Sequence, residues 1–161
     1  MYICILLLPF LSFISCFFFG RLIGIAGSCL MSTSAIFLSA FIAIFMVYET
    51  AVCGSSCNFV IGSWINSELL TINWGFCFDG LTAIILLVVC GISALVHLYS
   101  ISYMNGDPHQ GRFMSYLSLF TGFMLFLVAA DNLIVMFFGW EGIGLASYLL
   151  ISFWHTRIQA S

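Results

Sequence analysis

Long apolar runs follow one another along this chain and are separated by short polar stretches. Each run has roughly the 20 residues that an α-helix needs to cross the ~30 Å hydrocarbon core of a bilayer. The runs do not show the ~10-residue segments of alternating polarity that are typical of membrane β-barrels. The pattern therefore predicts an all-α, polytopic membrane bundle of five transmembrane helices, near residues 2–19, 26–47, 81–102, 113–130 and 132–153. We find no internal repeat or soluble segment, so residues 1–161 are expected to form a single membrane domain.

The connection between the second and third predicted helices has a different period. In "LLTINWGFCF" the apolar residues of 70–78 alternate with small or polar ones, which is the period of a strand with one apolar face. We therefore expect a short β-hairpin, with a first arm near 57–65 and a turn at Asn66 and Ser67. Asp79 follows directly and is predicted to cap the third helix, with proton carriage as the less favoured alternative.

Composition and charge agree with a membrane protein and suggest its orientation. Hydrophobic residues make up 63% of the chain and charged residues 6%, whereas soluble domains carry about a quarter charged residues. The basic residues are Arg21, Arg112 and Arg157, and five crossings place all three on one side. Arginine and lysine mark the cytoplasmic or matrix side, so the N-terminus is expected on the opposite side. The first run lacks a basic leading segment and a cleavage site, which favours a retained helix over a signal peptide.

Seven cysteines raise the question of a disulfide or metal site. Four of them lie inside predicted helices, where we interpret them as packing residues. Cys53, Cys57 and Cys77 lie on the outer side and could form a disulfide in an oxidising compartment. The spacing in "CGSSC" is not that of a zinc or thioredoxin motif, and no histidine lies near it. We also find no nucleotide-binding loop, no cluster-forming cysteines and no basic face for nucleic acid, so we expect no metal, cofactor or nucleic acid on this chain.

One acid stands in the fifth run. Glu141 is the only charged residue in "LIVMFFGWEGIGLASYLLISF" and falls near the middle of that helix. An acid at the bilayer centre costs ~3 kcal/mol on insertion scales, and acids kept there usually mark ion or proton pathways. The alternative is that Glu141 pairs with a base of another helix and only holds the bundle together.

The neighbours of this acid divide the helix into two faces. Gly144 and Tyr148 fall in line with Glu141 and would leave space beside its carboxylate. A second face about 120° away carries small residues, which let two helix backbones approach closely. The residues of this second face are Gly139, Gly142 and Ala146. Trp140 points away from the acid and is predicted to pack.

Two further polar stripes run along the third and fourth helices. Ser93, His97 and Ser100 share one face of the third helix. His97 could relay protons, because imidazole titrates near ambient pH, or it could be a satisfied hydrogen-bonding group. Three hydroxyls of the fourth helix lie near its inner end: Ser115, Ser118 and Thr121. For the serines we favour interhelical hydrogen bonds over a water path from the inner side.

Three stretches of the chain are similar to a known family. "DGLTAIILLVV", "VHLYSISYMNGDPHQGRFMSYLSLFTGFMLFLVAADN" and "GWEGIGLASYLL" resemble the N-terminal part of the NADH dehydrogenase subunit 5 family, the distal antiporter-like subunits of respiratory complex I. The resemblance implies a proton-translocating subunit of the NADH:ubiquinone reductase, with Glu141 as the family's essential glutamate. It implies that FMN, iron-sulfur clusters and ubiquinone belong to other parts of the complex. The implied setting is the mitochondrial inner membrane with the N-terminus in the intermembrane space, or alternatively a bacterial plasma membrane.

The resemblance also implies partners. Members of the family continue with a second acid, a broken helix whose lysine faces the glutamate, an inverted repeat and a long lateral helix. We expect a separate polypeptide to supply these helices and to dock against the fourth and fifth helices, beside other membrane-arm subunits and lipids. Two alternatives are a subunit of a cation/proton antiporter complex and a purely structural membrane subunit.

Overall fold

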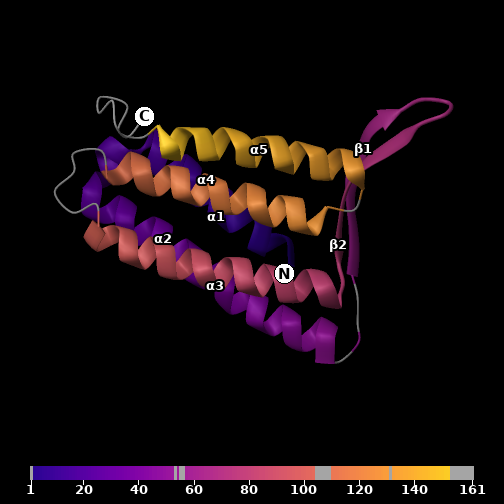
Figure 1. Ribbon diagram of the computed structural model, residues 1–161, viewed down its shortest axis with the longest axis horizontal. Coiled ribbons are helices and arrows are strands. Elements are labelled where there is room, and N and C mark those ends of the chain that lie inside the picture. Colours follow the sequence, from indigo (N-terminus) through magenta and orange to yellow (C-terminus); the bar gives the residue numbers. More distant parts are fainter. Residues whose placement is uncertain (1, 53, 55–56, 104–109, 131, 153–161) are drawn as a thin grey trace.

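A computed structural model describes residues 2–52, 54, 57–103, 110–130 and 132–152. Within these residues, helices lie side by side along the long axis and a pair of strands crosses one end of them (Figure 1). The helices are α1 (Tyr2–Phe18), α2 (Gly20–Val47), α3 (Gly80–Tyr103), α4 (Gln110–Ala129) and α5 (Leu133–Ile151), with a π-helical turn η1 (Tyr48–Val52) after α2. The strands are β1 (Cys57–Asn66) and β2 (Thr71–Phe78).

Four of these helices are long and apolar enough to cross a membrane. The candidate spans are Ala26–Thr50, Gly80–Tyr103, Gln110–Ala129 and Leu133–Ile151, and the apolar part of α1 is shorter. The chain is therefore a multi-pass, all-α membrane protein. The helices run up and down, so that the end of α1, the end of α3, the start of α4 and the end of α5 lie at the end of the bundle away from the strands (Figure 1). We call this the inner end.

The basic residues can be placed only in part. Arg21 lies in the first turn of α2 and Arg112 in the first turn of α4, both at the inner end, as the orientation argument requires. Arg112 is exposed. Arg157 lies outside the described residues.

A kink divides α2. The sequence predicts that the second helix begins near residue 26, whereas the structure begins it at Gly20 and breaks it at Gly24, with φ 84° and ψ 171°. A positive φ is costly for residues with a Cβ and is open to glycine. The predicted boundary therefore corresponds to the part of α2 that follows the kink.

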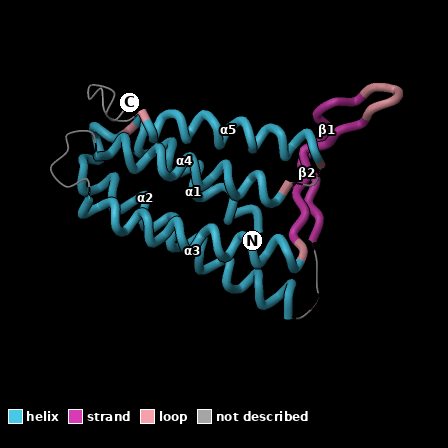
Figure 2. The backbone as a smooth tube through the Cα atoms, in the orientation of Figure 1, coloured by secondary structure: helices cyan, strands magenta, loops and turns pink. Residues whose placement is uncertain are grey.

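The two strands pair antiparallel and form the strand pair that the alternation predicts (Figure 2). Their register runs from Cys57 opposite Phe78 to Asn66 opposite Thr71. Two irregularities shift the register within β1. An extra residue in one strand reverses the side on which the following side chains point, which explains why the first arm does not alternate in sequence.

The turn lies slightly later than predicted. Asn66 is the last residue of β1, and the turn is closed by a hydrogen bond from the Ser67 amide to the Leu70 carbonyl, 2.8 Å long. The Ser67 hydroxyl also accepts from the Leu70 amide at 3.2 Å. Local hydroxyl-to-backbone bonds of this kind are a common way to stabilise a turn.

The apolar face of β2 closes one end of the helix bundle. Phe76 and Phe78 are buried, and Phe76 forms a bridge with Ala130 at the end of α4. They belong to one core cluster with residues from all five helices: Ile5, Leu6, Ala43, Met46, Ala83, Leu86, Cys90, Leu125, Ala129 and Val135. The strands therefore hold the outer ends of the helices in place.

The cysteines of the helices divide into two groups. Cys16, Cys29 and Cys90 are buried, as expected for packing residues, whereas Cys4 is exposed, which corrects the prediction at that position. Cys53, one candidate for the outer disulfide, lies outside the described residues.

Candidate functional site

Glu141 lies near the middle of α5. At 1.5 Å per residue it is about 12 Å from the first residue of this helix and about 15 Å from the last. Its side chain is exposed. The described part of the chain therefore places a carboxyl group at half the depth of a membrane-spanning helix without enclosing it.

The small residues of α5 face α4. Gly139 and Gly142 are buried, and a Cβ added to Gly139 would lie 2.9 Å from the Cα of Leu127. A Cβ on Gly142 would overlap the ring of Phe123. Real side chains do not approach this closely, so the two helices touch at a distance that only glycine allows. This confirms the predicted close-contact face, whose third member, Ala146, is also buried, and Val135 extends it.

The face that carries Glu141 is open. A Cβ on Gly144 would meet nothing within 4 Å, and Tyr148 is 67% exposed. The predicted space beside the carboxylate is present within the described residues. Trp140 is 66% exposed, so the prediction that it packs is wrong for this part of the chain.

Asn132 fixes the start of α5. Its side-chain oxygen accepts a hydrogen bond from the amide of Val135 at 3.0 Å, which is the geometry of a helix N-cap. Its side-chain nitrogen donates to the carbonyl of Asn73 in β2 at 2.9 Å. One side chain thus caps the start of α5 and ties it to the strand pair.

Asp79 caps α3 in the same way. Its Oδ1 accepts from the amide of Thr82 at 2.8 Å, and this hydrogen bond lowers the pKa of the Asp79 carboxyl. The predicted cap is confirmed. The carboxylate is exposed, so it stands outside the helix bundle.

His97 is fully buried between helices. Its Nδ1 lies 2.7 Å from the backbone carbonyl oxygen of Ser93. A carbonyl oxygen only accepts, so Nδ1 carries the hydrogen, and Nε2 of the neutral ring is left as an acceptor. That nitrogen lies 3.4 Å from the hydroxyl of Ser118 on α4.

The hydrogen bonds continue on both sides of the imidazole. Ser12 of α1 donates to the Ser118 hydroxyl at 2.9 Å. On the other side, the hydroxyls of Ser93 and Thr121 are 2.5 Å apart. Together these five residues, Ser12, Ser118, His97, Ser93 and Thr121, form an unbroken line of polar side chains across three helices, which we call the His97 chain.

The two predicted stripes do not join as whole columns. Ser100 is buried, but its hydroxyl donates to the Val96 carbonyl of its own helix at 2.8 Å. Ser115 likewise donates to the Arg112 carbonyl at 2.6 Å. Neither residue contributes to the His97 chain, whereas Ser12, which the sequence does not single out, does.

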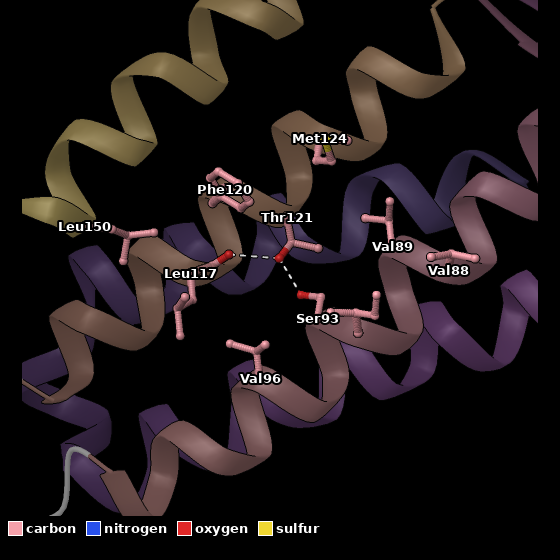
Figure 3. A pocket seen from close by; sticks show the side chains of 10 residues that line it. Val88, Val89, Ser93, Val96, Leu117, Phe120, Thr121, Met124 and Leu150 are labelled. Carbon is pink, nitrogen blue, oxygen red and sulfur yellow. Dashed lines mark hydrogen bonds between the residues drawn. The ribbon is translucent and has the colours of Figure 1, made fainter.

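A groove lies between α3 and α4 and has a volume of about 350 Å³ (Figure 3). Its walls are apolar, with Leu150 as the contribution of α5, except where Ser93 and Thr121 face each other (Figure 3). Exposed side chains such as Val88 and Ile92 line it, so it opens on the surface of the bundle. Glu141 is not among its lining residues.

Metal ligands do not gather in this region. In the part of the chain that the structure describes, no three His, Cys, Asp or Glu side chains are placed to share an ion. The described candidates for chemistry are therefore an exposed acid and a buried imidazole.

Two family comparisons match this chain. The family described as "NADH-Ubiquinone oxidoreductase (complex I), chain 5 N-terminus" matches residues 64–114. The family described as "NADH:quinone oxidoreductase/Mrp antiporter, TM" matches residues 130–161. The first match covers the end of β1, all of β2 and α3, and the start of α4. The second covers α5 and Glu141.

Curated relatives match along the whole chain. NADH-ubiquinone oxidoreductase chain 5 of Marchantia polymorpha is 53% identical over all 161 residues, which are 24% of that protein. The protein of the same name from Cryptococcus neoformans is 54% identical, again over 100% of this chain and 24% of the relative. That from Arabidopsis thaliana is 53% identical over 99% of this chain and 24% of the relative. The chain thus spans about a quarter of the length of these relatives.

Proposed function

Because this chain is homologous over its whole length to the N-terminal quarter of NADH-ubiquinone oxidoreductase chain 5, we propose that it is a proton-translocating part of the membrane arm of respiratory complex I. Its setting is the mitochondrial inner membrane, and its N-terminus faces the intermembrane space. In this arrangement residues 1–161 form one membrane domain, and α1 makes the first of five crossings. NADH oxidation, with its flavin and iron-sulfur clusters, and ubiquinone reduction belong to other subunits.

The observation that carries the proposal is the open position of Glu141 at half the depth of α5. An acid facing lipid at that depth costs about 2.5 to 3.5 kcal/mol on insertion scales. The cost is avoided when another protein segment or water covers the face. Most of each relative's length lies beyond the matched quarter, so further helices are available to cover it. The geometry is the same whether these helices belong to this polypeptide or to a separate one.

The chemistry follows from that covering. The family resemblance implies a lysine opposite the glutamate, and a nearby cation stabilises the carboxylate. When the cation moves away, the uncompensated carboxylate takes up a proton from the inner side. When the cation returns, the proton is released. Glu141 is the acid of this cycle, and His97 is a second proposed proton-handling residue.

The test is Glu141→Gln in the assembled complex. Glutamine has nearly the same shape and cannot ionise, so we expect fewer protons to be translocated for each NADH oxidised. Glu141→Asp is the matched control, because it keeps the acid and should keep part of the translocation. Both variants are compared by proton uptake into sealed vesicles, NADH oxidation rate and the amount of assembled complex.

Two results would contradict the proposal. An unchanged ratio of protons to NADH in Glu141→Gln would show that this acid is not part of the pump. Loss of assembly in Glu141→Gln but not in Glu141→Asp, with a normal ratio in the residual complex, would favour a purely structural subunit.

A cation/proton antiporter subunit is the second candidate. It is favoured by one observation, since the family that matches residues 130–161 is described for both quinone oxidoreductases and Mrp antiporters. The discriminating measurement is the driving force. Proton movement that follows a sodium gradient and does not need NADH would support the antiporter and reject the complex I assignment.

A further inference from the structure

The His97 chain is complete within the described residues, unlike the surroundings of Glu141. Three helices supply its members, and His97, Ser12 and Ser118 are at most 4% exposed. Buried polar groups of this kind often serve as interhelical hydrogen bonds and nothing more. The directions of these particular hydrogen bonds indicate a further role.

Ser118 has one hydroxyl hydrogen and two possible acceptors. Its oxygen lies 3.1 Å from the Met114 carbonyl and 3.4 Å from Nε2 of His97. Because Ser12 donates to this oxygen, the Ser118 hydrogen must point to one of the two acceptors. The hydroxyl can therefore rotate between a resting position on its own helix and a position that delivers a hydrogen to the imidazole.

On the far side of the ring the directions are also fixed. Thr121 donates to the Leu117 carbonyl at 2.9 Å, so Ser93 is the donor in the short bond between the Ser93 and Thr121 hydroxyls (Figure 3). The Ser93 hydroxyl oxygen also lies 3.4 Å from Nδ1 of His97. Ser93 thus touches the nitrogen that carries the ring hydrogen and, through Thr121, reaches the wall of the groove.

The chain also has a direction across the membrane. At 1.5 Å per residue, Ser12 and His97 lie about 9 Å from the inner ends of their helices. Ser93 and Thr121 lie deeper, at about 15 and 17 Å from the same end. The inner part of the line is enclosed, and its deep part meets the groove near the level of Glu141.

We propose that the His97 chain is a second proton path, separate from Glu141, which carries protons between the inner part of the bundle and the groove between α3 and α4. This inference rests on the proposed function, because it needs a proton-translocating complex. Leu150, the α5 residue of the groove, is nine positions from Glu141, which is half a turn around the helix axis. The groove and the acid therefore lie on opposite sides of α5.

Each step of the path conserves protons. The Ser118 O–H bond breaks as an Nε2–H bond forms, Ser118 regains a hydrogen from Ser12, and Ser12 regains one from water at the inner end. The imidazolium then loses its Nδ1 hydrogen to Ser93, while Ser93 passes its own hydrogen to Thr121 and Thr121 releases one to the groove. The ring is left with hydrogen on Nε2. Exchange with water, which removes the Nε2 hydrogen and adds one to Nδ1, restores the 2.7 Å bond to the Ser93 carbonyl and with it the resting tautomer.

The experiment compares His97→Gln and Ser118→Ala in the assembled complex. His97→Gln keeps hydrogen-bonding atoms but cannot carry a proton through the side chain. Ser118→Ala removes only a hydroxyl and leaves the imidazole without its proton source. Ser100→Ala is the matched control, because Ser100 is equally buried on α3 and its hydroxyl bonds only to its own helix. The measured quantities are protons translocated per NADH oxidised and the amount of assembled complex.

We expect both variants to lower the ratio of protons to NADH severalfold, with a normal amount of complex, and the control to leave both unchanged. A defect of packing alone would lower the amount of complex and leave the ratio unchanged, and this result would overturn the inference. If His97→Gln fails to assemble, Ser118→Ala decides alone, and a normal ratio there rejects the path. A normal ratio in both variants beside an impaired Glu141→Gln would reject only this inference, whereas a normal Glu141→Gln rejects the proposed function itself.

Discussion

His97 and Glu141 both lie within membrane-spanning helices but in opposite surroundings. His97 is 0% exposed, and its hydrogen-bonding partners come from α3 and α4, while Ser12 of α1 bonds in turn to its partner Ser118. Glu141 is exposed on the outward face of α5. Both are polar groups in a region of low dielectric, where an unpartnered polar group is costly. The described chain supplies the partners of one and leaves those of the other to what packs on α5.

The difference follows from where each helix stands. In the apolar stretch of α4 that could span a membrane, 44% of the residues are buried, whereas in that of α5 only 17% are buried. The central helix α4 packs against every other helix, whereas α5 packs mainly on α4 and touches β2. A polar group on α3 or α4 can therefore be enclosed by this chain alone. A group on the outer face of α5 can be enclosed only by something that lies beyond it.

The largest expected effect is on the contact between α4 and α5, where Gly139 lies against Leu127 and Gly142 against Phe123. We call this contact the seam. In Gly142→Ala the new Cβ would overlap the Phe123 ring, so the helices must separate or the ring must move. Such overpacking costs about 1–3 kcal/mol. We expect lower thermal stability of the purified protein in detergent and a displaced Glu141, while the His97 chain remains intact.

Gly144→Ala is the matched control for the seam. Alanine replaces glycine in the same helix and gains the same ~1 kcal/mol of helix propensity, but its Cβ would meet no atom within 4 Å. The difference between the melting temperatures of the two variants therefore measures packing alone. Equal melting temperatures would show that the α4–α5 contact is looser than described.

The next largest effect on stability is expected at Asn132, which caps α5 and ties it to β2. Asn132→Ala removes both the cap on Val135 and the hydrogen bond to Asn73, and we expect a loss of about 1–2 kcal/mol. Asn132→Asp keeps the cap but cannot donate to the Asn73 carbonyl, so it should lose only part of this stability. The check is the midpoint of chemical denaturation for the three proteins. An aspartate variant as unstable as the alanine variant would mean that the tie to β2, and not the cap, carries the effect.

Much of the fold could be predicted from sequence because a membrane imposes simple lengths. Apolar runs located the helices to within a few residues, and the alternation of 70–78 located β2. The break at Gly24 was missed, although the three glycines of "GRLIGIAG" were a signal for it. The register shifts in β1 could not be predicted, because an extra residue in a strand is defined only against its partner.

The candidate site also has features that could be predicted from the sequence and features that could not. The close-contact face of α5 could be predicted from the spacing of Gly139 and Gly142, because the size of a side chain is known from sequence without knowledge of the helix that packs against it. The members of the His97 chain were not readable. Ser12 and Ser118 are 106 positions apart, and no helical period connects them. Ser100 fits the stripe of His97 but bonds to its own helix, since the choice of partner depends on which helix lies opposite.

A smaller effect is expected at the cap of α3, the helix that carries His97. Asp79→Ala removes the acceptor of the Thr82 amide, and an exposed cap contributes about 0.5–1 kcal/mol. The hydrogen bond from Thr82 lowers the pKa of Asp79 from its ordinary value of 3.8. The stabilisation is therefore fully present above that value and is lost as the pH falls through the lower pKa of the folded state.

Denaturation midpoints measured between pH 7 and pH 3 test this cap. Asp79→Asn is the control, because asparagine also caps helices and does not titrate in this range. We expect the difference between the native protein and Asp79→Asn to change only at the acid end. A constant difference over the whole range would contradict the assignment of Asp79 as a charged cap.

The smallest effect on stability is expected at Thr33, a buried polar residue whose hydroxyl has no hydrogen-bond partner among the described residues. Thr33 lies in α2 and is 8% exposed. Thr33→Val has the same shape and removes the buried hydroxyl, so we expect a gain of up to about 1 kcal/mol. Thr50 lies in η1, equally buried, but its hydroxyl donates to the Met46 carbonyl at 2.7 Å. The same substitution at Thr50 should lower stability, because it removes a bond that is made. The check is the change in melting temperature of each variant. Changes of opposite sign would show that a buried polar group is tolerated in this bundle when it has a partner, as His97 has. A lower melting temperature in both variants would show that Thr33 also has a partner.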